Sequence, residues 1–163
     1  MIGFHLLRHG DAGDPERWSG DDHLRPLSEK GQRQAQRLGR LLRAMQDPPD
    51  LFITSPKVRA AQTADIVAEA VGAPVVIDER LGGPLHRETV AQILLDAGHA
   101  DRPCLVGHDP DFSDLLGELV GLPAIPMRKG AIARVDLRGN GPDGEPGILR
   151  YLIPPEVLPK KER

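Results

Sequence analysis

The stretch HLLRHGDAG, residues 5–13, joins an apolar run to an arginine, a histidine and a glycine. Its apolar half has the length and composition of a buried β-strand, and we expect a strand over residues 2–7. Arg8, His9 and Gly10 follow at the point where such a strand would end. Taken alone, the stretch fits either an ordinary strand end or a site where the backbone and a cationic side chain bind an anion. The rest of the chain has to separate these two interpretations.

The composition is typical of one soluble domain. The chain has 163 residues, enough for a single domain with one core, and aromatic residues make up only 3%, so we expect an aliphatic core. The net charge of -3 gives no reason to expect a nucleic acid or an anionic membrane as a partner. The single cysteine, Cys104, cannot form an internal disulfide and fits a reducing compartment. No apolar run approaches the ~20 residues of a membrane span and no signal-peptide pattern opens the chain, so we expect a cytoplasmic protein.

Short apolar runs alternate with amphipathic helical patterns along the chain. We expect strands at residues 2–7, 51–54, 75–77, 104–107, 131–137 and 148–153. We expect helices at residues 28–46, from Ser55-Pro56 to Gly72, at about residues 90–98, and from Asp109-Pro110 to Leu119. The alternation predicts a single α/β domain over residues 1–153, with a mostly parallel sheet and helices on both faces. The last two strands are predicted to form a C-terminal hairpin around GNGPDGEPG, and residues 154–163 a surface tail.

Cationic side chains follow three of the predicted strands. Arg8 and His9 follow the first strand, Arg59 lies in the first turn of the helix after the second, and His108 follows the fourth. In open α/β sheets, ligands bind beyond the carboxyl ends of the strands, so these side chains are expected to meet at one edge. Guanidinium groups and helix N-termini both favour phosphate. The sequence therefore predicts a phosphate clamp.

A histidine inside such a clamp can act as a nucleophile toward phosphorus. The attacking nitrogen must be uncharged, and an acceptor must hold the other ring nitrogen and so fix the tautomer. A second histidine would donate to the phosphoryl oxygens, and we expect it to be protonated. Because the guanidinium groups offset the phosphoryl charge, the reaction requires no metal.

Four sequence segments carry a resemblance to a known family. They are Arg8-His9-Gly10, Arg25-Pro26-Leu27-Ser28 with Gly31, Gln34 and Ala35, Ser55-Pro56 with Arg59, Gln62 and Thr63, and Val106-Gly107-His108 with Pro110. In this order they resemble the RHG, RPLTxxGxxQA, SPxxRxxQT and VGHxP segments of the histidine phosphatase superfamily, which has the phosphoglycerate mutase-like fold. The resemblance implies a phosphatase without a cofactor, in which His9 accepts the phosphoryl group. It implies that Arg8, Arg59 and His108 form the rest of the phosphate pocket.

The spacing between two of these segments narrows the subgroup. Only 49 positions separate Arg59 from His108, and a strand, a helix and another strand fill them, so we expect no cap insertion. The chain is similar in this respect to SixA-type phosphohistidine phosphatases, which lack the lid. An open site admits a side chain from another protein, so a protein phosphohistidine is the expected substrate. Hydrolysis of a small phosphoester at the same site is the alternative.

The general acid is less clearly marked. Many members of the family use a Glu after the third strand, where this chain has Glu79, which could equally be a surface carboxylate paired with Arg80. Asp22 and Asp11 are further acidic candidates in the first loop. The remaining histidines are predicted to be structural or exposed, namely His5, His23, His86 and His99. Cys104 is predicted to be a core residue.

Two other classes of function compete with this one. A metallophosphatase would use His9, Asp11, His108 and Asp109 as ligands. Arg8 and Arg59 argue against it, because two guanidinium groups would repel a divalent cation, and sensitivity to a chelator would separate the two. A non-catalytic phosphate-binding module would keep the same arginines without turnover and would never carry phosphate covalently.

Overall fold

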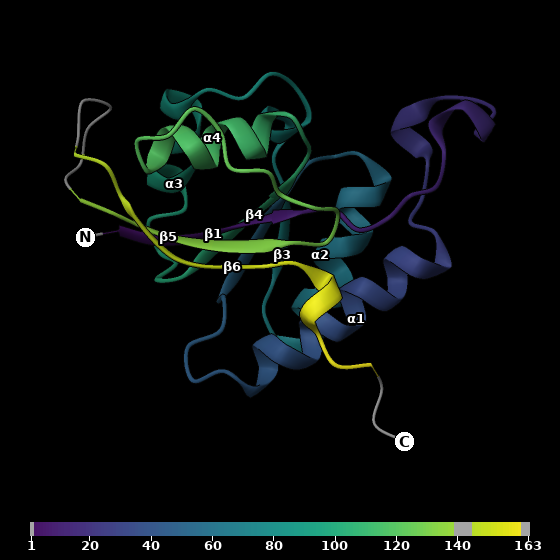
Figure 1. Ribbon diagram of the computed structural model, residues 1–163, viewed down its shortest axis with the longest axis horizontal. Helices are drawn as coiled ribbons and strands as arrows, with labels where there is room; N and C mark the ends of the chain where they lie inside the picture. The colour runs from purple at the N-terminus through teal and green to yellow at the C-terminus, as the bar shows by residue number, and fades with distance from the viewer. Residues whose placement is uncertain (1, 139–144, 161–163) are drawn as a thin grey trace.

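The computed structural model describes residues 2–138 and 145–160, and within them one mixed sheet forms the centre of the molecule (Figure 1). Its strands are β1 (Ile2–Arg8), β2 (Leu51–Thr54), β3 (Val75–Ile77), β4 (Pro103–Gly107), β5 (Ile132–Leu137) and β6 (Ile148–Ile153), in the order β3-β2-β4-β1-β5-β6. β1 to β4 run parallel to one another, and β5 is antiparallel both to β1 and to β6. The predicted parallel sheet and C-terminal hairpin are thus confirmed. Part of the predicted turn, residues 139–144, lies outside the described residues.

Four helices cover the two faces of the sheet, as predicted (Figure 1). They are α1 (Glu29–Ala44), α2 (Val58–Val71), α3 (Arg87–Asp96) and α4 (Asp111–Leu119). Leu38 of α1 and Val67 of α2 belong to one buried cluster, and Ile93 of α3 and Leu116 of α4 belong to the cluster on the opposite face. Both clusters are almost entirely aliphatic, as the composition predicts. No helix in the described ranges combines the length and apolarity needed to cross a membrane.

Between Arg59 and His108 the chain forms the rest of α2, then β3, a short 3-10 turn η3 (Glu79–Gly82), α3 and β4. This arrangement contains no cap, as the spacing predicts. The first loop, between β1 and α1, contains two 3-10 turns, η1 (Pro15–Arg17) and η2 (Asp22–Leu24), and projects from the body of the molecule at the upper right of Figure 1.

Two predicted helix starts are wrong, and both errors fall at the site edge. Ser28 caps α1 as expected, accepting a hydrogen bond from the Gly31 N–H. By contrast, α2 begins at Val58, because Ser55 is used in a turn in which its Oγ accepts from the Lys57 N–H. Similarly, α4 begins at Asp111 and not at Asp109-Pro110. The segments between strand and helix are therefore longer than predicted.

The predicted surface tail differs from the structure over residues 154–160. A 3-10 turn, η4 (Pro155–Val157), follows β6 directly, and Pro155 and Leu158 are buried. Leu158 belongs to the apolar cluster formed with α1 and α2. Three prolines close together made the segment look irregular, but Pro155 and Leu158 are buried, whereas Val157 is exposed.

The loop after β1 lies against the start of α1 at a backbone-to-backbone contact. A Cβ on Gly10 would approach the Gly31 carbonyl oxygen to 2.9 Å, and a Cβ on Gly31 would collide with the carbonyl oxygen of Asp11. Gly10 is therefore needed for this close approach to α1. The contact fixes the position of the residues that follow β1.

Replacement of Gly31 should therefore destabilise the protein. Alanine normally stabilises a helix relative to glycine, but here its methyl group would force two backbone segments apart. We expect Gly31→Ala to lower the free energy of unfolding by ~2 kcal/mol or more in urea titrations. Gly83→Ala is the control, because no atom lies within 4 Å of a Cβ there. Equal stability of the two variants would contradict the packing described.

Candidate active site

The register of β1 and β4 brings two histidines together. Arg8 pairs with Gly107, so His9 and His108 follow at adjacent strand ends, and the His9 N–H donates to the Gly107 carbonyl at 3.0 Å. The two imidazole centroids are 5.1 Å apart. After β1 the chain leads to α1 on one face of the sheet, and after β4 it leads to α4 on the other. This divergence opens the kind of crevice in which α/β sheets bind ligands.

His9 is held as a neutral imidazole with a defined tautomer. Its Nδ1 lies 2.7 Å from the Gly10 carbonyl oxygen, which can only accept, so Nδ1 carries the proton and Nε2 has the free lone pair. Burial, together with the charges of Arg59 and Arg8, lowers the pKa of His9 to about 4. The acceptor that the sequence analysis required for a nucleophilic histidine is thus the next carbonyl along the chain.

His108 lies beside Ser55, whose role the sequence analysis missed. The His108 Nε2 is 2.7 Å from the Ser55 Oγ. The Ser55 hydroxyl is buried and has no other acceptor among the described residues, so we infer that its proton points to Nε2 and that the ring proton of His108 lies on Nδ1. Burial and the neighbouring His9 lower the pKa of His108 to about 3. The expectation of a protonated His108 is therefore wrong for the protein by itself, because burial, His9 and the nearby cations all disfavour its protonation.

The two arginines are fixed by groups on opposite sides of the crevice. Arg8 donates from Nη1 to the Met127 carbonyl at 2.8 Å, and the same atom lies 3.4 Å from Asp109 Oδ2. Arg59 lies in the first turn of α2, as predicted, and donates to the Asp22 carbonyl at 2.8 Å and to its carboxylate at 3.1 Å. Asp22 thus orients Arg59, a contact that no motif in the sequence indicated.

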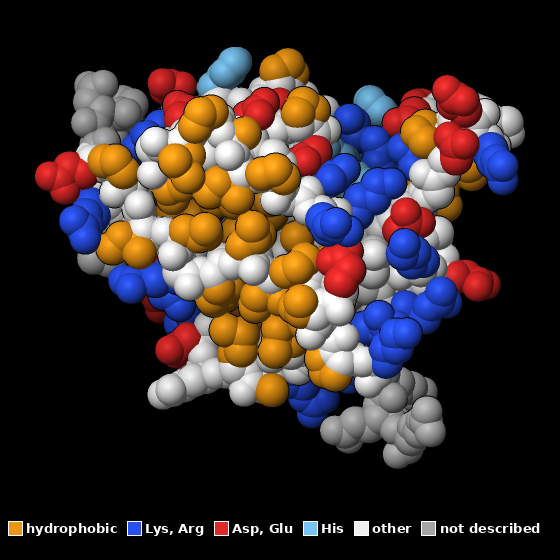
Figure 2. Space-filling view, in the orientation of Figure 1, with side chains coloured by type: hydrophobic (Ala, Val, Ile, Leu, Met, Phe, Trp, Pro, Cys, Tyr) orange, Lys and Arg blue, Asp and Glu red, His pale blue; other side chains and the backbone are white. Residues whose placement is uncertain are grey.

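Several nitrogen atoms of these residues lack a partner. Among the described residues, six buried side-chain polar atoms make no hydrogen bond, and three of them are Arg8 Nε, Arg59 Nε and His108 Nδ1. Buried donors are normally satisfied, so their concentration in three side chains around His9 favours an anionic ligand with several acceptor oxygens. Figure 2 shows Lys and Arg side chains gathered on the right of this face, at the edge toward which β1 runs.

The other polar residues of the matching segments hold the loops around His9. Thr63 Oγ1 accepts from the Gly10 N–H at 3.1 Å, and Gln34 Oε1 accepts from the Asp11 N–H at 2.8 Å. Gln62 Oε1 accepts from the Leu27 N–H at 2.8 Å. These uncharged side chains therefore hold the loops around His9 in place through hydrogen bonds to backbone N–H groups.

The acidic candidates differ in their surroundings. The Ser28 hydroxyl donates to the Asp11 carboxylate at 2.6 Å and holds its pKa below the ordinary range. A hydrogen bond from Arg25 and the charge of Arg59 likewise lower the pKa of Asp22. Both carboxylates are ionised near neutral pH and are poor proton donors. Lys129, which the sequence analysis missed, lies 3.6 Å from Asp11 Oδ1.

Glu79 is exposed at the start of η3. The suggested pairing with Arg80 is wrong, because Arg80 pairs with Asp78 at 2.6 Å and with Asp96 at 2.9 Å. The Asp78 carboxylate therefore positions Arg80 through an ion pair. Among the described residues, the Glu79 carboxylate forms no such ion pair, and Glu79 therefore remains a candidate for the general acid.

The four proposed metal ligands do not assemble. Asp109 accepts from the Ser113 hydroxyl at 2.6 Å and faces Arg8, and Asp11 is taken up by Ser28 and Lys129. Within the residues described, no three His, Cys, Asp or Glu side chains come together as a metal site. The geometry thus favours an anion over a cation between His9 and His108.

The remaining histidines and the cysteine are placed as predicted. His5 is buried with its Nε2 2.9 Å from the Tyr151 hydroxyl, and burial lowers its pKa to about 4. His23, His86 and His99 are exposed. Cys104 is fully buried, and burial raises the pKa of its thiol, which makes it a core residue and a poor nucleophile.

Comparisons with known proteins agree with this geometry. The model of the histidine phosphatase superfamily, branch 1, matches residues 4–82. The chain is 29% identical over 151 residues to an uncharacterized protein of Mycobacterium tuberculosis, which covers 86% of this chain and 93% of that protein. It is 26% identical over 189 residues to the probable phosphoglycerate mutase GpmB of Cronobacter sakazakii, covering 83% of this chain and 85% of that protein.

The fold is similar to that of a protein histidine phosphatase SixA solved in complex with tungstate. The TM-score is 0.78 at 24% identity, and the similarity covers 94% of this chain and 97% of that one. The motifs around the site resemble those of the histidine phosphatase superfamily, whose model matches residues 4–82, and the fold is similar to that of SixA.

The lowered pKa of His9 predicts how the stability of the protein depends on pH. An unfolded histidine takes up a proton near pH 6.5, whereas folded His9 does so only near 4. The unfolded chain therefore binds more protons in this window, and stability should fall as the pH falls through it. Nitrogen NMR should show His9 as the neutral Nδ1–H tautomer at pH 7, with protonation only near pH 4.

His9→Asn is the control, since it removes one depressed histidine and should reduce the loss of stability between pH 6.5 and 4. A His9 titration midpoint at or above 6.5 would contradict the description of this site.

Proposed function

We propose that this protein is a metal-independent histidine phosphatase that hydrolyses phosphohistidine on another protein, with His9 as nucleophile and Arg8, Arg59 and His108 as the phosphate pocket. The observation that carries the proposal is the neutral, oriented imidazole of His9 beside three buried and unpaired donors. A cytoplasmic location, expected from the lone buried cysteine, belongs to the same proposal.

In the first step, the Nε2 lone pair of His9 forms a bond to phosphorus while the bond from phosphorus to the substrate nitrogen breaks. The Gly10 carbonyl, 2.7 Å from Nδ1, stabilises the positive charge that develops on the His9 ring. Donors from Arg8, Arg59 and His108 offset the charge on the phosphoryl oxygens. The leaving imidazole departs neutral when its other nitrogen carries a proton from solvent.

In the second step, a water oxygen attacks the phosphorus and the bond to His9 Nε2 breaks. The water proton leaves with solvent, His9 returns to the neutral tautomer, and inorganic phosphate is released. Neither step requires a strong acid from the protein when the substrate is phosphohistidine. This fits a site where Asp11 and Asp22 are both held ionised.

The absence of a cap between Arg59 and His108 supports a protein substrate. The alignment with GpmB extends over 189 positions while it uses only 83% of this chain, so that relative carries segments without a counterpart here. A less enclosed site gives a side chain on another protein room to enter. A small phosphoester is the second candidate, and the exposed carboxylate of Glu79 favours it, because an alcohol leaving group needs a proton.

Covalent labelling tests the mechanism. A brief reaction of the wild-type protein with a phosphohistidine donor, followed by an alkaline quench, should leave acid-labile phosphate on His9. His9→Ala should lose the label and lower the turnover by ~1,000-fold or more, because the attacking nitrogen is removed. EDTA should change neither result. His99→Ala, at an exposed position, is the matched control and should label as the wild type does.

Retention of the label in His9→Ala would contradict the assignment of the nucleophile. Normal phosphate binding without labelling of the wild type would identify a binding module, and loss of activity in EDTA would favour a metal. If the wild type clearly prefers small phosphoesters, the proposed protein substrate would be wrong, but the mechanism through His9 would still hold.

A further inference from the structure

The outer face of α1 carries a row of cations. Lys30, Arg33, Arg37 and Arg40 recur at intervals of three and four residues and therefore share one side of the helix. Lys30, Arg33 and Arg40 are exposed and Arg37 is half-buried. Among the described residues, none of the four takes part in an ion pair within 4.0 Å. We call these four residues the basic face of α1.

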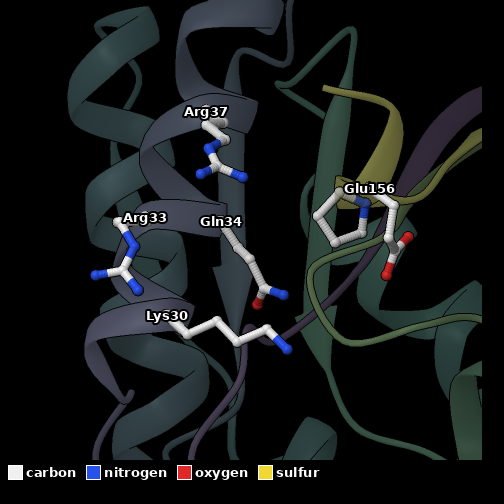
Figure 3. A pocket seen from close by; sticks show the side chains of 6 residues that line it. Lys30, Arg33, Gln34, Arg37 and Glu156 are labelled. Carbon is white, nitrogen blue, oxygen red and sulfur yellow. The ribbon is translucent and has the colours of Figure 1, made fainter. Parts of the chain in front are cut away.

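The basic face borders a hollow of about 310 Å³ between α1 and η4. Lys30, Arg33 and Arg37 line it together with Gln34, Pro155 and Glu156. Figure 3 shows Lys30 and Gln34 reaching from α1 toward the segment that carries Glu156. Glu156 lies 3.4 Å from Arg128 on its other side, so it offers only partial compensation for the three cations of the hollow.

The basic face begins at the rim of the catalytic site. Gln34, which lines the hollow, holds the Asp11 N–H directly after the His9 loop, and Gly31 packs against Gly10. A protein that presented a phosphorylated side chain to His9 would therefore lie close to α1. The charges nearest to the site on this side would contact that protein first.

The opposite rim has the opposite charge. Residues 14–22 of the first loop carry four acidic residues and one basic residue. Asp14 pairs with Arg17, and Asp22 pairs with Arg25 and Arg59, so the acidic residues without an ion pair among the described residues are Glu16 and Asp21. In Figure 2 the carboxylates of this projecting loop gather at the upper right, and Lys and Arg side chains gather below them, over α1. A uniformly anionic surface such as a bilayer or a nucleic acid would be repelled by the loop. A protein with a local acidic patch can meet α1 while avoiding it.

We propose that the basic face of α1 is the docking surface for an acidic patch on the phosphoprotein substrate, placed beside its phosphohistidine. This inference rests on the proposed function and adds the chemistry of the partner. Complementary charge steers association and fixes orientation, so the surface acts on encounter and binding and leaves the chemical step at His9 unchanged.

Charge reversal on α1 tests the inference. The probes are an acidic phosphocarrier domain with one phosphohistidine, a short phosphohistidine peptide without acidic residues, and p-nitrophenyl phosphate. Arg33→Glu and Arg37→Glu should each lower kcat/KM for the acidic domain by ~10-fold at low salt, mainly through KM. Rates on the neutral peptide and the small ester should stay within ~2-fold of wild type, which also verifies folding. Added salt should reduce the wild-type advantage.

Arg87→Glu, at the start of α3 on the other side of the sheet, is the matched control and makes the same change in net charge. It should leave all three rates near the wild-type values. Equal loss in Arg87→Glu and in the α1 variants would overturn the inference, since only total charge would then matter. Wild-type rates of the α1 variants on the acidic domain would overturn it as well.

A binding assay separates this inference from the proposed function. The unphosphorylated acidic domain should bind the wild type ~10-fold more tightly than Arg33→Glu or Arg37→Glu, whether or not turnover occurs. Failure of the wild type to hydrolyse even the neutral phosphohistidine peptide would reject the proposed function alone. Absence of binding by the wild type, or binding of anionic vesicles in place of the acidic domain, would reject the docking surface alone.

Discussion

The parallel pairing of β1 with β4 determines where the chemistry can occur. Because Arg8 pairs with Gly107, His9 and His108 emerge side by side, and the His9 N–H is fixed on the Gly107 carbonyl. A slip of one residue in this register would turn one histidine to the other face of the sheet. The apolar residues of both strands, buried between the two helical layers, resist such a slip. Core packing and catalytic geometry therefore depend on the same pairing.

The loops around His9 determine which of its ring nitrogens carries the proton and keep the ring neutral. The glycine contact between Gly10 and Gly31, and the side chains of Thr63 and Gln34, hold the backbone that carries the Gly10 carbonyl. That carbonyl fixes the tautomer of His9, and burial removes the ring from water and keeps it neutral. Arg8 and Arg59, which we propose bind phosphate, also disfavour protonation of His9, so one set of charges would serve both purposes.

Much of this arrangement could be predicted from the sequence. The strands are short apolar runs with turn residues at both ends, and three of the four motif segments lie at strand ends of a parallel sheet. The exact starts of α2 and α4 could not be predicted, because Ser55 accepts from the Lys57 N–H in a turn before α2 and Asp109, two residues before the start of α4, accepts from the Ser113 N–H. The pairing of Asp22 with Arg59 and the approach of Lys129 to Asp11 join segments far apart in the chain, and no local pattern encodes them. The neutral state of His108 depends on burial, which spacing does not reveal.

A crystal structure with vanadate would test the central claim most directly, since vanadate can adopt the five-coordinate geometry of phosphoryl transfer. We expect the vanadium to lie in line with His9 Nε2, with Arg8, Arg59 and His108 donating to its oxygens and the Gly10 carbonyl still on Nδ1. Vanadate bound elsewhere, for example in the hollow between α1 and η4, or a His9 ring turned to present Nδ1, would contradict the account.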